Sequence, residues 1–167
     1  EGKFLKDGTR SENNWTEFIP NEHNAFWKNP PRGFVSSANQ HPANVSYPYY
    51  VTADRFEAYR NRRINHVLRE DSLITVEDMK NLHFDNYSLK AAESLPWMLD
   101  QLRGMQLNAI ENSIVGNLTT WDYFFNASSE AATCYDIWIR NLFSATWDEI
   151  KLSNDQGVRL AYPTDYA

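Results

Sequence analysis

Residues 29–42 of this 167-residue chain read "NPPRGFVSSANQHP", and this stretch decides how the first part of the chain is interpreted. Proline turns enclose an apolar pair, Phe34 and Val35, which is followed by three small residues and then by Asn39. An apolar pair ahead of small side chains is more typical of a short strand than of a plain loop. We therefore expect a strand over residues 33–38 that delivers the amide side chain of Asn39 to a defined place.

The remainder of residues 1–50 is predicted to consist of strands and loops. Most of the prolines and glycines of the chain lie in this segment. Residues 2–10, "GKFLKDGTR", are expected to form a β-hairpin with Asp7 and Gly8 at its turn. Residues 41–50 are expected to be loop, because two prolines interrupt regular structure there.

Residues 51–167 are predicted to be a helical region, because the pattern changes there to helical periodicity. The first helix is expected over residues 52–70, with Thr52 as its N-cap. Arg60 falls within the apolar stripe of this helix, which comprises Phe56, Ile64 and Val67. An arginine in such a stripe either meets a carboxylate or a group in a cleft, or extends its charged end to solvent.

The later helices are located by their capping residues. Thr75 followed by Asp78 resembles a capping box at the start of a second helix. Pro96 is expected to begin a third helix, Gly104 to end it, and a shorter helix to follow over residues 108–118.

The last helix is predicted over residues 128–150, with Ser129 as its cap. Its apolar stripe is typical of a protein core and comprises Ala131, Tyr135, Trp138, Leu142 and Ile150. The chain is therefore predicted to be mainly α, a single domain with a bundle-like helical segment and a short strand region at its N-terminus.

The composition excludes several classes of function. A net charge of −6 without a basic tract argues against nucleic acid as a partner. No apolar run is long enough to span a bilayer.

The lone Cys134 is expected to be a small buried hydrophobe. The four histidines have no metal-ligand spacing, and the sequence contains none of the common phosphate-binding, zinc-protease or serine-hydrolase motifs. Neither a metal site nor a complete catalytic machine is expected.

One block of sequence resembles the penicillin acylase (penicillin amidase) family, which also includes acyl-homoserine-lactone acylases. The block consists of "NPPRGFVSSANQHP", then "YPYY" at residues 47–50, then "YRNRRI" at residues 59–64. Weaker similarity extends to "DGTRSENNWTEFIP" upstream and to "TVEDMKNLHFD" and "LTTWD" downstream, so that it covers about residues 3–150. The resemblance implies an N-terminal-nucleophile hydrolase with an α+β, αββα fold, in which residues 1–50 would join the catalytic sheet.

The resemblance also implies what two residues do. Asn39 would be an oxyanion-hole donor, and Arg60 would support the active site by orienting Asn39 or substrate, or by tuning the α-amine. The nucleophile would be a Ser, Thr or Cys at the start of a β-chain, with its own α-amine as the base. Its substrate would be a linear amide, such as the acyl side chain of a β-lactam, an acyl-homoserine lactone or a similar N-acyl compound.

The chain opens on Glu1 and reads as an internal fragment of the β-chain. We therefore expect it to be inactive alone, with the α-chain and the remainder of the β-chain as partners. By resemblance, the complete protein would be periplasmic or secreted. Strand edges left unpaired by the missing sheet would favour a non-native dimer.

Two positions depart from the family pattern. Residues 49–51 are Tyr-Tyr-Val and Asp54 comes late, so the calcium ligand of the family has no clear counterpart and no cofactor is expected in this fragment. Tyr123 stands where the family often has glycine, which is expected to alter a turn.

Two other interpretations remain open. The first is a stand-alone, aromatic-rich helical module that binds a glycan or a protein partner. The second is an acylase-like scaffold that has lost its nucleophile.

Overall fold

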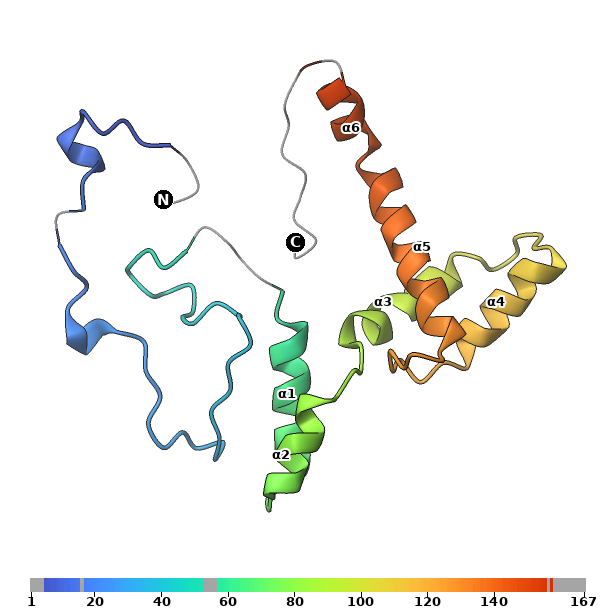
Figure 1. Ribbon diagram of the computed structural model, residues 1–167, viewed down its shortest axis with the longest axis horizontal. Helices are drawn as coiled ribbons and strands as arrows, with labels where there is room; N and C mark the ends of the chain where they lie inside the picture. Colours follow the sequence, from blue (N-terminus) through green and yellow to red (C-terminus); the bar gives the residue numbers. More distant parts are fainter. Residues whose placement is uncertain (1–4, 16, 53–56, 156, 158–167) are drawn as a thin grey trace. The chain divides into compact units, whose positions relative to one another are not determined.

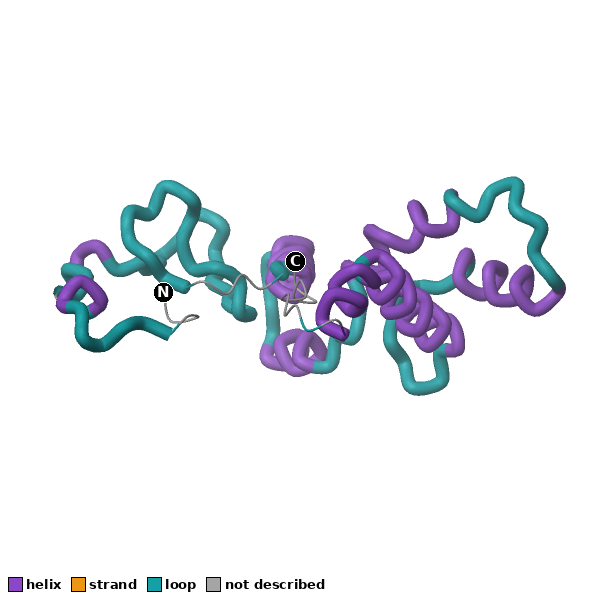
Figure 2. The backbone as a smooth tube through the Cα atoms, turned by 90° about the horizontal axis from the view of Figure 1, so that it is seen from above, coloured by secondary structure: helices purple, strands orange, loops and turns teal. Residues whose placement is uncertain are grey.

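The computed structural model describes residues 5–15, 17–52, 57–155 and 157 (Figure 1). Over these residues the regular structure is helical and contains no strand (Figure 2), which confirms the mainly α prediction. The α-helices are α1 (Tyr59–Glu70), α2 (Val76–His83), α3 (Leu89–Asp100), α4 (Ala109–Thr119), α5 (Glu130–Thr146) and α6 (Asp148–Asp155), and the 3-10 helices are η1 (Ser11–Asn13) and η2 (Asn21–His23).

The described residues fall into two compact units that divide between Arg69 and Glu70. The first unit contains the loop-rich residues up to 52 and nearly all of α1, and the second contains α2 to α6. The expected division into segments 1–50 and 51–167 stays a prediction. Within the described ranges, no helix combines the length and the apolar character that crossing a bilayer requires.

The predicted hairpin over residues 2–10 is not supported by the described residues. Its turn is present, because Asp7 Oδ1 accepts hydrogen bonds from Thr9 N at 3.0 Å and from Thr9 Oγ1 at 2.7 Å. The chain then enters η1 instead of a returning strand, and residues 2–4 lie outside the described residues. A hairpin needs a paired backbone ladder, and none forms here among the described residues.

The strand expected over residues 33–38 is also absent. An extended segment becomes a strand only when a neighbouring backbone pairs with it, and nothing in the described part of the chain does so. No strand edge occurs among the described residues, and the dimer through such edges stays a prediction.

The first long helix begins later than residue 52. Helix α1 starts at Tyr59, whose backbone N–H donates to the Glu57 carboxylate at 2.6 Å, so Thr52 is not its cap. The predicted stripe residue Phe56 lies outside the described residues, and its partners Ile64 and Val67 are half-buried.

Three helix starts agree with the sequence. Thr75 caps α2 through the predicted capping box, with Asp78 N donating to Thr75 Oγ1 at 3.2 Å and Thr75 N donating to the Asp78 carboxylate at 2.8 Å. Ser129 caps α5 as predicted, since its Oγ accepts from Ala132 N at 3.2 Å. Helix α4 appears where the shorter helix is expected and is capped by Asn108.

Pro96 does not begin a helix, contrary to the prediction. It lies inside α3, which starts after Ser88, where Ala91 N donates to Ser88 Oγ at 3.1 Å. A proline removes one backbone donor from a helix, but the α3 face that contains Leu95 is buried and holds the helix together. The helix ends at Asp100, and Gly104, with φ +82°, lies in the turn that follows.

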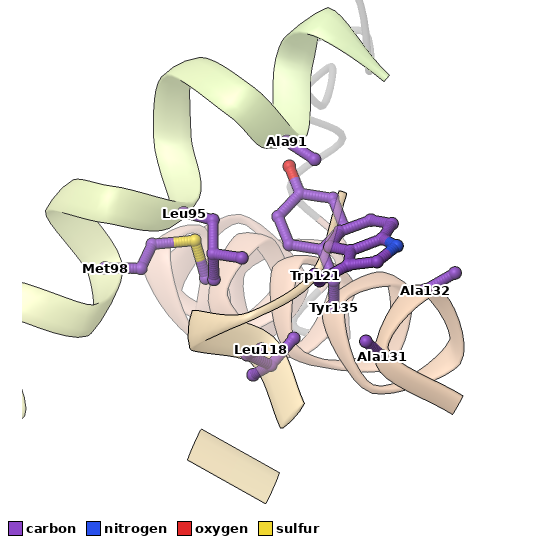
Figure 3. Close-up of a cluster of buried hydrophobic side chains, with 8 residues drawn as sticks. All are labelled: Ala91, Leu95, Met98, Leu118, Trp121, Ala131, Ala132 and Tyr135. Atoms are coloured by element: carbon purple, nitrogen blue, oxygen red, sulfur yellow. The ribbon is translucent and has the colours of Figure 1, made fainter. Parts of the chain in front are cut away.

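The core of the second unit lies where α3, α4 and α5 meet (Figure 3). Its centre is aromatic: Trp121 and Tyr135 have ring centroids 5.6 Å apart, and the Tyr135 hydroxyl is 2.8 Å from Ser94 Oγ. The buried residues are Ala91, Leu95, Met98, Leu118, Trp121, Ala131, Ala132 and Tyr135. Cys134 is a free thiol that packs against this core as a small side chain, but it is half-buried and not fully buried as predicted.

The segment between α4 and α5 contains Tyr123 in the left-handed region at φ +65°, which favours glycine. Its carbonyl accepts from Ser88 N at 2.9 Å beside an isolated bridge between Tyr87 and Phe124. The predicted final helix over residues 128–150 is interrupted at Trp147, the C-cap of α5, after which α6 begins.

Candidate functional site

The segment that leads to Asn39 is held by turns, not by a sheet. Gly33, at φ +78°, closes a turn in which its N–H donates to Pro30 O at 2.9 Å. Ala38 is buried, with 9% of its surface exposed, and its N–H donates to Gln40 Oε1 at 2.7 Å. Asn39 follows in the left-handed region at φ +65°, a conformation that asparagine adopts more readily than most residues. The backbone therefore presents Asn39 at a sharp bend.

The structure brings the two predicted site residues, Asn39 and Arg60, into contact. Arg60 lies at the start of α1, and its Nη2 donates to Asn39 Oδ1 at 2.6 Å and to the Ala38 carbonyl at 3.3 Å. Arg60 is exposed. The Arg60 side chain therefore meets a polar group, the bend that carries Asn39, and does so at an exposed position instead of within the apolar stripe.

This contact determines which way the Asn39 amide faces. A guanidinium only donates hydrogen bonds, so the amide oxygen must be the atom that faces Arg60. The Asn39 NH₂ group is then directed elsewhere, and within the described residues Nδ2 makes no hydrogen bond. An amide does not titrate, so its two N–H groups are available to an oxygen acceptor at any ordinary pH.

A second set of polar side chains links the same segment to α1. Ser36 Oγ donates to Asn65 Oδ1 at 2.8 Å, Asn65 Nδ2 donates to Asn61 Oδ1 at 2.7 Å, and Asn61 Nδ2 donates to Ser36 Oγ at 3.2 Å. These three half-buried side chains form a closed hydrogen-bonded ring, here called the Ser36 ring. Sequence reasoning missed it, although Asn61 and Asn65 are four apart and therefore share one face of the helix.

Arg32 extends this network to the start of the segment. Its Nε donates to the Phe34 carbonyl at 2.9 Å, and its Nη1 donates to Asn65 Oδ1 at 3.3 Å. The guanidinium lies over the rings of Phe34 and Trp27, with centroid distances of 4.9 and 5.5 Å. Stacking of this kind holds an arginine while leaving its N–H groups free to donate.

The side chains that most often bind metal ions do not cluster within the described residues. No group of three or more His, Cys, Asp or Glu side chains in the described ranges is arranged to hold an ion. Asp54, the residue considered in relation to calcium, lies outside the described residues. At the bend itself, the guanidinium of Arg60 and the amide of Asn39 carry N–H donors, which recognise oxygen acceptors.

An amide N–H donor such as an asparagine side chain is one of the groups that can bind the negative charge developing on oxygen during acyl transfer. The sequence model of the penicillin amidase family matches residues 1–164, and the chain belongs to this family. The chain is also 29% identical over 135 residues to penicillin acylase 2 proenzyme of Pseudomonas sp. (strain SE83). That alignment covers 81% of this chain and 17% of the relative, so the chain spans about a sixth of its length. No solved structure matches the chain significantly.

Proposed function

We propose that this chain is part of an amide hydrolase of the penicillin amidase type and that Asn39 supplies an oxyanion donor in its active site. The contact between Arg60 and Asn39 carries the proposal, because the two side chains to which the family motifs point are 2.6 Å apart. Family membership and the similarity to a penicillin acylase proenzyme support the reaction class.

In this proposal, Asn39 acts when the nucleophile adds to the substrate. Attack on the amide carbon moves an electron pair onto the carbonyl oxygen and forms a tetrahedral intermediate. Asn39 Nδ2 donates to this substrate oxygen. Arg60 meanwhile holds the Asn39 side chain by donating to its Oδ1 atom. As the intermediate collapses, the carbonyl re-forms and the amine leaves with the proton that the base took from the nucleophile. Water then attacks the acyl-enzyme, releases the acid and regenerates the nucleophile. Because the donor is positioned before the reaction, little reorganisation is needed when charge develops.

The nucleophile and its α-amine base are assigned to another part of the complete protein, so this chain is proposed to be inactive alone. The remainder of the β-chain and an α-chain are the proposed partners. The substrate is proposed to be a linear N-acyl compound such as an acylated β-lactam or an acyl-homoserine lactone. No cofactor is assigned to this chain, and any calcium would be held elsewhere. The complete protein is proposed to be periplasmic or secreted.

The test is removal of the Asn39 amide in the complete enzyme, followed by hydrolysis of a chromogenic N-acyl anilide. Asn39→Gly removes the amide and keeps the left-handed backbone at low cost. We expect kcat to fall about a hundredfold to a thousandfold, the usual effect of losing one oxyanion donor. Unchanged hydrolysis by this variant would refute the proposed role.

Asn29 provides a matched control. It is also an exposed asparagine at positive φ, +46°, so Asn29→Gly makes the same chemical change in the same unit. The control variant is expected to hydrolyse the anilide at close to the wild-type rate. An equal loss in both variants would indicate that the backbone bends, and not the Asn39 amide, account for the effect.

A further inference from the structure

We infer that Ser36 is a positioning residue for the Asn39 amide, acting through the Ser36 ring. This inference rests on the proposed function of Asn39. The hydrogen bonds of Ser36 Oγ within the described residues go to Asn61 and Asn65, and none goes to Asn39. It fixes the near end of the short segment 36–39, whose far end is held by Arg60.

The ring is directional, and the Arg32 N–H that donates to Asn65 Oδ1 selects this direction over the reverse one in which both amides are flipped. The Ser36 hydroxyl donates to Asn65 and accepts from Asn61, and the two amides are joined to each other by Asn65 Nδ2 and Asn61 Oδ1. Flipping either amide would place donor against donor or acceptor against acceptor. Hydrogen bonds in such a chain polarise and strengthen one another, and Arg32 adds a charged donor to the same Asn65 oxygen.

The ring and Arg60 act on one short piece of backbone from one helix. Asn61 and Asn65 lie one turn apart on α1, and Arg60 directly precedes Asn61. Three residues of extended chain reach at most about 10 Å, so a segment fixed to α1 at Ser36 and again at Ala38 has little freedom. The position of the Asn39 bend relative to α1 is therefore set by two attachments, one at Ser36 and one at Ala38 and Asn39. The attachment at Ser36 makes no contact with the Asn39 amide.

Replacing Ser36 by alanine opens the ring at its only hydroxyl. The Asn61 NH₂ group loses the hydrogen bond it makes to Ser36, and Asn65 Oδ1 retains only Arg32 as a side-chain donor. The side-chain atoms of Ser36, Asn61 and Asn65 are not part of the hydrophobic core of the second unit. The predicted consequence is a looser 36–39 segment and a less well-placed Asn39 donor.

The experiment measures anilide hydrolysis by the complete enzyme carrying Ser36→Ala. We expect kcat to fall about fivefold to tenfold, as the loss of one or two neutral hydrogen bonds predicts, while KM changes less than twofold. Ser36→Thr retains the hydroxyl and should recover most of the rate. Asn65→Ala opens the ring from the other side and should reproduce the loss, and combining it with Ser36→Ala should add little.

The deciding measurement places Ser36→Ala in an Asn39→Gly background. A positioning role predicts no further loss of kcat there, because the group being positioned is absent. A merely structural role predicts the same fractional loss in both backgrounds. Ser46→Ala is the matched control, because it removes a hydroxyl that bonds an asparagine oxygen, Asn44 Oδ1 at 2.7 Å, in the same unit, and it should leave the rate unchanged.

The outcomes separate this inference from the proposed function. If Asn39→Gly lowers kcat but Ser36→Ala does not, or if Ser36→Ala lowers it equally in both backgrounds, the positioning role is overturned and the oxyanion role stands. If Asn39→Gly leaves kcat unchanged, the oxyanion role fails and the positioning role fails with it. Melting temperatures of all variants identify any loss caused by unfolding.

Discussion

Removing Arg60 tests whether this side chain orients Asn39 or acts on substrate directly. The guanidinium Nη2 lies 2.6 Å from Asn39 Oδ1 and 3.3 Å from the Ala38 carbonyl. A hydrogen bond from a charged donor contributes about 1.5–3 kcal/mol, and the lower value applies because Arg60 is exposed. Loss of about 1.5 kcal/mol corresponds to roughly a tenfold effect. We therefore expect Arg60→Ala to lower kcat about tenfold in the complete enzyme.

The assay compares kcat for anilide hydrolysis by Arg60→Ala, Arg60→Lys and Asn39→Gly. Lysine keeps the charge and one of the donors, so Arg60→Lys should retain more activity than Arg60→Ala. The orienting role requires that Arg60→Ala costs less than Asn39→Gly and adds little to it. Arg62→Ala is the control, because it removes the same charge from the same helix, where Arg62 stacks on Tyr59.

Two results would contradict this reasoning. A loss for Arg60→Ala as large as that for Asn39→Gly would mean that Arg60 contacts the substrate or the α-amine in addition to Asn39. Equal losses for Arg60→Ala and Arg62→Ala would mean that the effect arises from the net charge of the helix.

Two further predictions concern the second unit of the chain. Leu95→Ala should lower the free energy of unfolding by about 3–5 kcal/mol, because Leu95 is 1% exposed. Leu73→Ala, at an 81% exposed position, should change it by less than about 0.5 kcal/mol. Urea denaturation measures both variants, and equal effects would mean that the core lies elsewhere. Hydrogen bonds from the Thr75 hydroxyl and then from the Thr75 backbone lower the pKa of Asp78 below its usual 3.8. The ionised Asp78 carboxylate therefore stabilises the cap of α2 above pH 3.8, and this stabilisation is lost as the pH falls through the lowered pKa of Asp78 in the folded state. Asp78→Asn should remove the contribution of Asp78 to the loss of helicity in acid, which circular dichroism measures.

Local features of the fold could be predicted from the sequence because their interactions span only a few residues. The capping box joins Thr75 to Asp78, and the cap of α5 joins Ser129 to Ala132. Each depends on side-chain chemistry three residues from its partner, which the order of amino acids fixes directly. The mainly α character follows from helical periodicity for the same reason.

Other features depended on partners that no local pattern specifies. A strand over residues 33–38 requires a neighbouring backbone, and none pairs with it in the described part of the chain. Pro96 stands within α3 because burial of Leu95 and its neighbours outweighs the loss of one backbone hydrogen bond. The strand prediction failed because no pairing partner is present, and the Pro96 prediction failed because tertiary packing outweighed local propensity.

The candidate site divides in the same way. The motifs by themselves identified Asn39 and Arg60 as the residues to examine, through their resemblance to a family pattern. Only the tertiary structure decided that Arg60 meets the oxygen of Asn39, 21 residues away, and that Ser36 closes a ring with two asparagines 25 and 29 residues further on. The physical reason is that hydrogen bonds between a loop and a helix depend on where the chain folds back, and sequence periodicity describes one element at a time.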